Sequence, residues 1–362
     1  MKIAFFGSSL VSSYWNGAAT YYRGLLKEIA ALGHTITFFE PDAFERQTHR
    51  DIDDPHWARV VVYPATPDGW QRSLSEAARS SDLIIKASGI GVFDSELAGA
   101  VAEVSSKALR IYWDVDAPAT LQAVGEDQAH HLRTAVPGYD LVLTYGGGDR
   151  VVSAYRAIGA RDCVPIYNAL DPDTHYPVPP NLHSGFSLGL LANRLPDREA
   201  RIEEFFIGPA RALPTKRFIL GGSGWDSKPL TENIELLGHV GTGQHNAFFA
   251  SALATLNVNR ASMAEYGFSP PTRIFEAVGA GACLITDAWK GIENFLDPGT
   301  EILVASNGAD VAAHLASLTP IRARAIAGRA RLRIRAHHTY RQRALQFDHL
   351  LEGLNSRTEA AE

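Results

Sequence analysis

Short runs of β-forming residues alternate with helical patterns along most of this 362-residue chain. In the first part we expect strands at residues 2–6, 35–40, 60–63, 83–87, 109–113, 141–144 and 164–166, and helices at 18–32, 73–80, 96–104, 127–136 and 151–158. Alternation of this kind builds a parallel sheet that helices cover on both faces. The sequence therefore predicts a doubly wound α/β unit at the start of the chain.

A proline-rich stretch, NALDPDTHYPVPPNLHSG, interrupts the alternation at residues 168–185. The pattern then restarts, with strands expected at 186–191, 217–220, 234–237, 254–258, 283–286 and 301–304, and helices at 197–213, 245–250, 272–278 and from 309 onward. We expect two Rossmann-like domains, residues 1–170 and 186–340, joined by a linker at 171–185 and facing each other across a cleft. Residues 341–362 are expected to form a helical tail that packs back on the first domain.

Composition narrows the class of protein. A formal net charge of −6 argues against a general nucleic-acid binder, because such proteins use a positive field to displace counterions. The N-terminus lacks the features of a signal peptide, and no apolar stretch reaches the roughly 18 to 20 residues of a membrane helix. The two cysteines, Cys163 and Cys283, fit no metal motif and are expected to be buried thiols of a reducing compartment. We therefore expect a soluble, cytoplasmic protein.

The segment GFSPPTRIFEAVGAGACLITD, residues 267–287, predicts a helix that begins at an anion-binding turn. Two prolines suit the first turn of a helix, where a missing N–H costs nothing. The turn would direct free amides, the hydroxyls of Ser269 and Thr272 and the guanidinium of Arg273 to one place, as a diphosphate requires. One turn later, Glu276 is placed to accept both hydroxyls of a ribose.

This segment resembles that of glycosyltransferases with the two-domain GT-B fold, in the form R-I-F-E-A-x-G-A-G-A-C-L-I-T-D found in the CgeB-like glycosyltransferases. The resemblance implies a donor nucleotide-diphosphate sugar bound mainly by the second domain, with no metal and no other cofactor. Retaining members of the broader class carry Glu-x(7)-Glu here. Glu276 fits the second position, but Phe268 stands at the first and Glu265 lies three residues further back, so the stereochemistry of transfer stays open.

Four further segments of the second half are candidate parts of the same site. Arg194 ends the first strand and either faces the diphosphate or forms a surface ion pair. Gly222 and Ser223 belong to a glycine-rich turn that permits close approach of a ligand to the backbone. His239 lies in a segment that resembles the one beside the nucleotide base, although its side chain is expected to be packed in the core. Asn259 ends a buried strand with polar groups that an apolar core would not place there.

In the first half, Asn16 and Gly17 follow the first strand and resemble the loop that faces the donor phosphates and sugar in GT-B enzymes. Asp114 and Asp116 follow another strand, so their carboxylates are expected at the cleft edge. Either can act as the general base for an acceptor hydroxyl, with Asp116 the first candidate, and either can cap the next helix. Two carboxylates at this spacing can also hold a divalent metal, but the GT-B resemblance requires none.

Residues 322–343 carry eight arginines and no acidic side chain, which suggests either a solvated helix face or a weak contact with an anionic membrane or lipid-linked acceptor. Saccharide, lipid-linked and protein acceptors are all compatible with the sequence. Two other functions stay open: a sugar-nucleotide epimerase or hydrolase, and a non-catalytic sugar-nucleotide-binding protein. A nicotinamide dehydrogenase is disfavoured, because the loop after the first strand lacks the G-x-G-x-x-G spacing.

Overall fold

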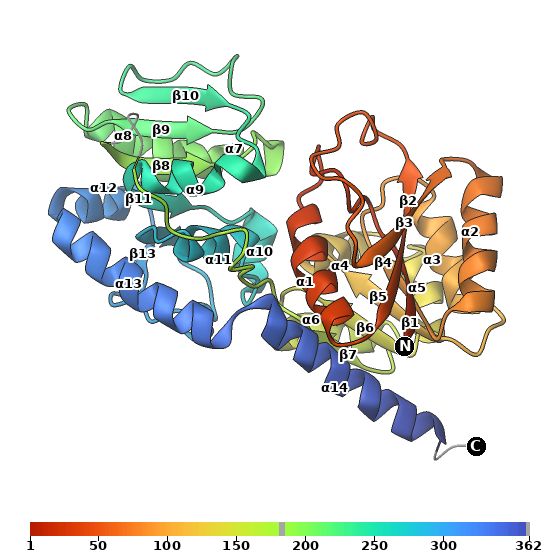
Figure 1. The fold of residues 1–362 in the computed structure, drawn as a ribbon. Helices are drawn as coiled ribbons and strands as arrows, with labels where there is room; N and C mark the ends of the chain where they lie inside the picture. The colour runs from red at the N-terminus through yellow and green to blue at the C-terminus, as the bar shows by residue number, and fades with distance from the viewer. Residues whose placement is uncertain (181–184, 360–362) are drawn as a thin grey trace. The chain divides into compact units, whose positions relative to one another are not determined.

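The computed structural model describes residues 1–180 and 185–359, and the chain divides into two compact units (Figure 1). Unit 1 comprises residues 1–168 together with the described part of 340–362, and unit 2 comprises Ala169–Thr339. The predicted linker therefore belongs to unit 2, and its residues 181–184 lie outside the described part of the chain, as do residues 360–362 of the predicted tail.

Unit 1 contains a seven-stranded parallel sheet with the strand order β3-β2-β1-β4-β5-β6-β7. The strands are β1 Lys2–Phe6, β2 Thr35–Asp42, β3 Ala58–Pro64, β4 Leu83–Ala87, β5 Leu109–Asp114, β6 Leu141–Thr144 and β7 Cys163–Pro165. The helices are α1 Ala19–Ala31, α2 Pro67–Ser80, α3 Asp94–Glu103, α4 Ala117–Glu126, α5 Leu132–Ala135, α6 Gly148–Ala157 and α14 Tyr340–Glu359.

Helices pack on both faces of this sheet, as two adjacent residues of β5 show. Successive side chains of a strand point to opposite faces. Trp113 lies against Tyr21 of α1 and Phe347 of α14, with ring centroids 6.1 and 5.5 Å away. Its neighbour Tyr112 instead contacts Tyr155 of α6, with centroids 6.5 Å apart. The last helix of the chain thus completes one face of the first sheet.

Unit 2 contains a six-stranded parallel sheet with the order β10-β9-β8-β11-β12-β13. Its strands are β8 Phe186–Leu191, β9 Phe218–Gly221, β10 Ile234–Gly238, β11 Ala252–Asn257, β12 Leu284–Asp287 and β13 Leu303–Ala305. Its helices are α7 Pro196–Ile202, α8 Gly208–Ala212, α9 His245–Ala250, α10 Ala261–Tyr266, α11 Thr272–Gly279, α12 Gly308–Ser317 and α13 Pro320–His337. A π-helical segment, Glu203–Ile207, joins α7 to α8.

The predicted fold class, two doubly wound α/β units, is confirmed. One predicted helix is misplaced, and one observed helix was not predicted. A helix was expected at residues 127–136, whereas α4 begins at Ala117 and only the four-residue α5 falls in that range. Pro118 explains the early start, because proline is well suited to the first turn of a helix. The short helix α10 was not expected at all.

Both sheets reverse their strand order at one point, between β1 and β4 in unit 1 and between β8 and β11 in unit 2. Doubly wound sheets bind ligands outside the carboxyl ends of their strands at such a switch point. The loops that follow these four strands are therefore the places where a functional site is expected.

Candidate functional site

Three buried hydrogen-bond donors without a partner are found in the segments that follow β8 and β11, the two strands at the switch point of unit 2. They are Nε of Arg198 on α7, Nδ2 of Asn259 and Nε of Arg273 on α11, and none makes a hydrogen bond to any described residue. Buried polar atoms are nearly always hydrogen-bonded in folded proteins, so each exception needs an explanation. A ligand rich in acceptor oxygens would satisfy all three.

Arg198 and Arg273 lie close enough to repel each other. Burial, together with the positive charges of Arg273 and Arg260, lowers the pKa of Arg198 to about 10, although the charge of Asp197 opposes the shift. Burial also lowers the pKa of Arg273, while the carboxylate of Glu276 opposes that shift. Two desolvated guanidinium groups beside each other are costly unless an anion lies between them.

The N-terminus of α11 adds backbone donors to this cluster. The helix begins after Pro271 and has no side-chain cap. The amide of Ile274 donates to the carbonyl of Pro271 at 3.1 Å, which leaves the amides of Thr272 and Arg273 for another acceptor. Ser269, predicted to bind the donor, is buried and donates its hydroxyl to the carbonyl of Gly267 at 3.0 Å. Thr272 occupies the first position of the helix and is partly exposed.

Glu276 is buried on α11, beside two histidines of unit 2. Its carboxylate and the ring nitrogens of His175 and His245 all lie within 4.8 Å of one another, and the two rings are joined by an Nε2···Nδ1 contact of 3.3 Å. Burial lowers the pKa of His245 to about 4, although the Glu276 charge raises it. His245 is therefore neutral at pH 7. A trio of this kind has the donor set of a metal site, but its ring–ring contact is satisfied as a hydrogen bond.

Three residues of unit 2 that were predicted to bind the donor make hydrogen bonds or ion pairs within the protein. Arg194 forms a two-pronged ion pair with Glu199, with both N···O distances at 2.9 Å, so the ion-pair alternative holds for this arginine. The amide of Gly222 donates to the carbonyl of Gly238 at 2.6 Å, and that of Ser223 donates to Oδ1 of Asn193 at 2.9 Å. Gly222 is needed here for a packing reason, because it has a φ of +132° and a Cβ would lie 2.1 Å from the carbonyl oxygen of Ala192.

His239 was expected to have a packed side chain, and this expectation is wrong. The residue follows β10 and is exposed. An apolar strand precedes it, but β10 is the edge strand of its sheet, so the turn after it has solvent on one side.

Arg198 is the functional candidate that the sequence did not single out. It follows the predicted Arg194 by four residues, and both belong to the segment after the first strand of unit 2. The signal was a second arginine in the first turns of a helix that begins at the switch point. Sequence alone does not say which of the two arginines Glu199 neutralises.

In unit 1, the side chain of Asn16 holds the loop after β1 together. It accepts a hydrogen bond from the hydroxyl of Ser8 and donates to the carbonyls of Ser9 and Ser12, at 2.8 and 2.9 Å. These contacts give Asn16 a structural role in the loop, and its predicted contact with the donor stays a prediction. Gly17 is exposed, with open space around its Cα.

The two candidate bases lie in different environments. Asp114 is completely buried, and its carboxylate accepts hydrogen bonds from Ser88, Thr120, Tyr155 and the amide of Asp116. Burial raises the pKa of Asp114, although these hydrogen bonds oppose the shift. Asp116 is partly exposed at the start of α4, and its side chain makes no cap hydrogen bond there. Of the two aspartates, only Asp116 is partly exposed.

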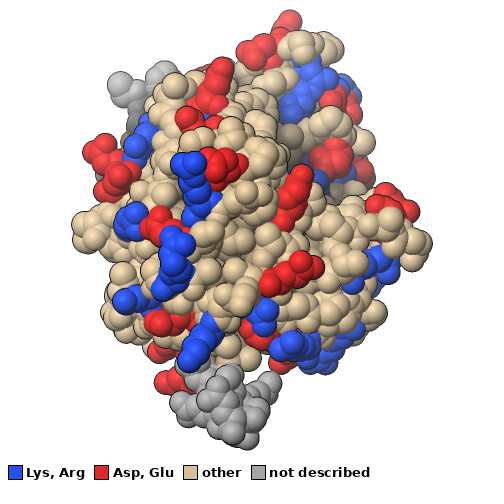
Figure 2. Space-filling model, turned by 90° about the vertical axis from the view of Figure 1, so that its right-hand side faces the viewer, with Lys and Arg blue, Asp and Glu red and all other residues tan. Residues whose placement is uncertain are grey.

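Charges of both signs are interspersed over the face shown in Figure 2. Among the arginines of α13, Arg329 and Arg331 donate to backbone carbonyls of unit 2, and Arg333 pairs with Asp297 and Glu301 at 3.1 and 3.4 Å. Three arginines of this segment thus bind other parts of unit 2 and help to hold α13 in place. No described helix is both long and apolar enough to cross a bilayer.

Comparison with known proteins supports a glycosyltransferase. Residues 198–349 match the model of a glycosyl transferase-like family, and no curated protein matches the sequence. The fold is similar to that of sucrose-phosphate synthase from Thermosynechococcus elongatus, with a TM-score of 0.73 and 14% identity over 99% of this chain and 100% of that chain.

Two further solved structures with a similar fold contain a nucleotide. HepE of Anabaena, in complex with UDP and glucose, has a TM-score of 0.68 and 17% identity over 98% of this chain and 100% of that one. T4 phage BGT, in complex with its UDP-glucose substrate, has a TM-score of 0.61 and 11% identity, with 98% of this chain and 99% of that chain covered. At such identities the likeness establishes the fold. The chain therefore has the GT-B fold, and its residues 198–349 are similar to a glycosyl transferase-like family.

Proposed function

We propose that this chain is a glycosyltransferase whose unit 2 binds a nucleotide-diphosphate sugar and whose reaction transfers the sugar to a hydroxyl acceptor. The observation that carries the proposal is the pair of half-buried, mutually repelling guanidinium groups of Arg198 and Arg273, each with a buried and unpartnered Nε, at the uncapped start of α11. The matched family and the fold support the same activity.

A diphosphate fits this cluster in both charge and hydrogen-bonding capacity. It brings about two negative charges and several acceptor oxygens, whereas the cluster offers donors only. A hydrogen bond to a charged group contributes roughly 1.5–3 kcal/mol, so two or three of them account for much of a micromolar affinity, about −8 kcal/mol. Because arginines and helix amides meet the phosphate charge, we expect donor binding to persist in the presence of EDTA.

Glu276 is proposed to accept hydrogen bonds from the ribose hydroxyls, one helical turn after Thr272. The uridine nucleotides in the HepE and T4 phage BGT structures favour a uridine diphosphate sugar as the donor. Asp116 is proposed as the general base that takes the proton of the acceptor hydroxyl. The motif at Arg273–Asp287 supports membership of the CgeB-like glycosyltransferases, and two buried free cysteines support a cytoplasmic location.

The test is calorimetric titration of UDP into the wild-type protein and the variant Arg198→Met. This substitution removes the charge and keeps a side chain of similar length. We expect the UDP affinity to fall at least about tenfold, since one charge-assisted contact is lost. The unfolding temperature without ligand should be unchanged or higher, because the substitution removes a desolvated charge that repels Arg273. If Arg198 only stabilised the fold, Arg198→Met would lower the unfolding temperature and leave the UDP affinity unchanged.

Arg194→Met is the matched control, because this neighbouring arginine is already engaged by Glu199. Its UDP affinity should stay within about threefold of wild type, well under the loss expected for one charged contact. Equal UDP affinity in Arg198→Met and the wild type would contradict the proposed site. Release of free sugar from UDP-glucose at the same rate with and without any acceptor would favour a hydrolase instead.

A further inference from the structure

Trp15, in the loop after β1 of unit 1, is exposed in a backbone conformation that disfavours it. Its side chain is 59% exposed and its φ is +47°. Bulky residues rarely adopt the left-handed region, and holding one there costs free energy that the rest of the structure must offset. Strained residues of this kind cluster at binding and catalytic sites, so Trp15 is a reason to look for a ligand.

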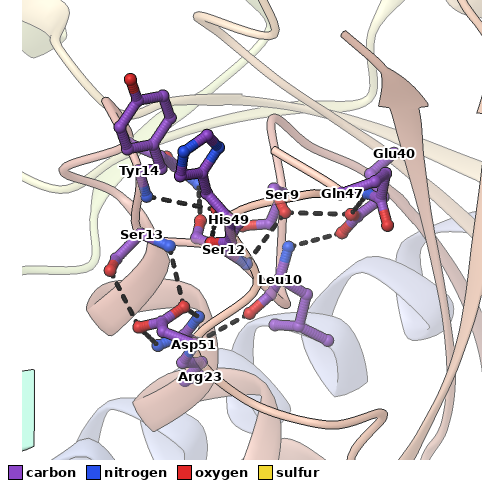
Figure 3. A network of polar contacts seen from close by, with 11 residues as sticks. Ser9, Leu10, Ser12, Ser13, Tyr14, Arg23, Glu40, Gln47, His49 and Asp51 are labelled. Carbon is purple, nitrogen blue, oxygen red and sulfur yellow. Dashed lines mark hydrogen bonds and ion pairs between the residues drawn. The ribbon is translucent and has the colours of Figure 1, made fainter. Parts of the chain in front are cut away.

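Two neighbouring rings turn Trp15 into part of an aromatic corner, formed by Tyr14, Trp15 and His49. Tyr14 stacks on His49 with ring centroids 4.0 Å apart and planes at 9°, and the close-up in Figure 3 shows the two rings together. Trp15 stands almost perpendicular to Tyr14, at 80° with centroids 6.4 Å apart. The corner thus presents aromatic surfaces in two directions.

A dense set of hydrogen bonds holds the corner in place (Figure 3). Arg23 on α1 pairs with both oxygens of Asp51, at 3.0 and 2.7 Å, and its Nε donates to the carbonyl of Leu10 at 2.7 Å. Asp51 also accepts from the amide and hydroxyl of Ser13 at 3.0 and 2.8 Å. The loop after β1 and the segment that carries His49 are therefore fixed to each other before any ligand arrives. Such preorganisation lowers the entropic cost of binding.

The same network continues on the other side of the loop, where Glu40 at the end of β2 is fully buried. Its carboxylate accepts from the hydroxyl of Ser9 at 2.9 Å, from the amide of Leu10 at 2.6 Å and from Gln47 at 2.6 Å. These contacts come from both segments that form the corner. The strained φ of Trp15 is thus set by its surroundings, with Asn16 anchored directly after it.

Polar groups border the corner. Asp51 and the residues that follow it, Arg50–Asp54, line a shallow surface hollow of about 670 Å³. Arg50 pairs with Asp54 inside this segment, and Asp51 joins it to Ser13 in the loop of Trp15. An exposed aromatic face next to carboxylates suits a sugar ring, whose C–H groups pack on aromatic rings while its hydroxyls donate to acidic oxygens.

We propose that this aromatic corner binds a saccharide, with a pyranose ring packed on Trp15 and its hydroxyls bonded to polar groups of the hollow formed by Arg50–Asp54. The saccharide is the acceptor of the reaction, so this identification rests on the proposed function. The acidic border disfavours an anionic membrane surface as the occupant, since like charges repel. The corner lies on the segment that was expected to contact the donor, and it assigns that segment to the acceptor.

The experiment is saturation-transfer NMR on the full chain with methyl β-glucopyranoside, methyl β-galactopyranoside, cellobiose and maltose as probes. We expect the wild-type protein to bind at least one of these sugars. Trp15→Gly should weaken that binding at least about tenfold, whereas Trp15→Phe should stay within about threefold, because the aromatic face is retained. The unfolding temperature of Trp15→Gly should equal or exceed that of the wild type, because glycine adopts a positive φ without strain.

Tyr176→Ala is the matched control, since it removes an aromatic side chain that is 48% exposed but belongs to unit 2. It should bind the sugars as the wild type does. Absence of binding for all four sugars, or equal binding by Trp15→Gly and the wild type, would overturn the proposal. UDP titration of the same samples separates the two ideas: wild-type protein that binds UDP but none of the sugars refutes only the corner, and absent UDP binding by the wild type refutes the donor site.

Discussion

At the scale of single residues, Asp114 and Asp116 show how position decides the chemistry of a carboxylate. Asp114 is enclosed by four donors, and its hydrogen bonds connect β4, β5, α4 and α6. Asp116 begins the next helix, where solvent reaches its side chain. The carboxylate of Asp114 therefore stabilises the carboxyl edge of the sheet, and the more exposed Asp116 is the one proposed as the base.

Substitution should separate these roles. Asp116→Asn is expected to abolish glycosyl transfer while UDP binding and the unfolding midpoint stay unchanged, because the amide cannot accept the proton. Asp114→Ala is expected to lower the free energy of unfolding by roughly 3 kcal/mol, since it leaves several buried donors without an acceptor. Product assays and urea denaturation of both variants measure the two effects. Wild-type turnover in Asp116→Asn would exclude the base.

Residue types in this site could be predicted from the sequence, but their partners could not. The segment 267–287 placed Arg273 and Glu276 on one helix, because helical spacing and prolines are local signals. The pairing of Arg194 with Glu199 and the approach of Arg198 to Arg273 depend on how α7 and α11 pack. Likewise, the hydrogen bonds of Asn16 depend on the path of its loop.

At the scale of elements, the proline-rich segment at the start of unit 2 packs directly on α11. A Cβ on Gly279 would lie 2.3 Å from Cδ1 of Leu170 and 3.0 Å from the carbonyl oxygen of His175. The same segment is held at α9, where Asn246 donates to the carbonyl of Thr174 at 3.0 Å. The helix that carries Arg273 and Glu276 is thus positioned partly by a segment that has no regular structure of its own.

Two helical glycines test this contact. Gly279→Ala should destabilise the protein by about 1–3 kcal/mol, because the added methyl group has no room. Gly328→Ala, in the open interior of α13, should instead stabilise it by about 0.5–1 kcal/mol, since nothing lies within 4 Å of the new Cβ and alanine favours a helix. Urea denaturation measures both changes. Equal effects of the two substitutions would show that Leu170 does not press on α11.

Strands were easier to predict than helix boundaries. The buried strands of parallel sheets are continuous apolar runs, and β1, β4, β6 and β8 were predicted at their observed bounds. The helix expected at 197–213 occurs as α7 and α8 with a π-helical segment between them. The spacing of apolar residues in the sequence does not reveal where a helix changes from α-helical to π-helical hydrogen bonding.

At the scale of the whole molecule, the two units differ in how the chain builds them. Unit 2 is one continuous stretch, Ala169–Thr339, whereas unit 1 needs both ends of the described chain. The last helix is bound to unit 1 by Phe347 against Trp113, by Arg343 to the carbonyl of Tyr167 at 3.2 Å, and by Asp348 to His34 at 3.0 Å.

This difference predicts that unit 2 can fold by itself, whereas unit 1 without α14 cannot. A fragment comprising residues 169–339 should fold cooperatively and bind UDP, because it contains a complete sheet and all the proposed phosphate contacts. A fragment comprising residues 1–168 should be unstable, because Trp113 and Tyr21 lose the helix that covers them. Circular dichroism, thermal melting and UDP titration test both fragments. A stable, cooperatively melting 1–168 fragment would contradict this view of α14.

Because α14 is translated after the rest of unit 1, its place in the sequence affects folding on the ribosome. The nascent chain offers residues 1–168 first, yet one face of their sheet lacks the helix α14 until translation reaches Tyr340 and beyond. The later-made stretch can meanwhile complete its own core, so the second sheet matures before the first. A polypeptide that stops before Tyr340 would leave the aromatic side chains of Trp113 and Tyr21 without their contacts to α14, and proteases and chaperones act readily on such incompletely folded chains.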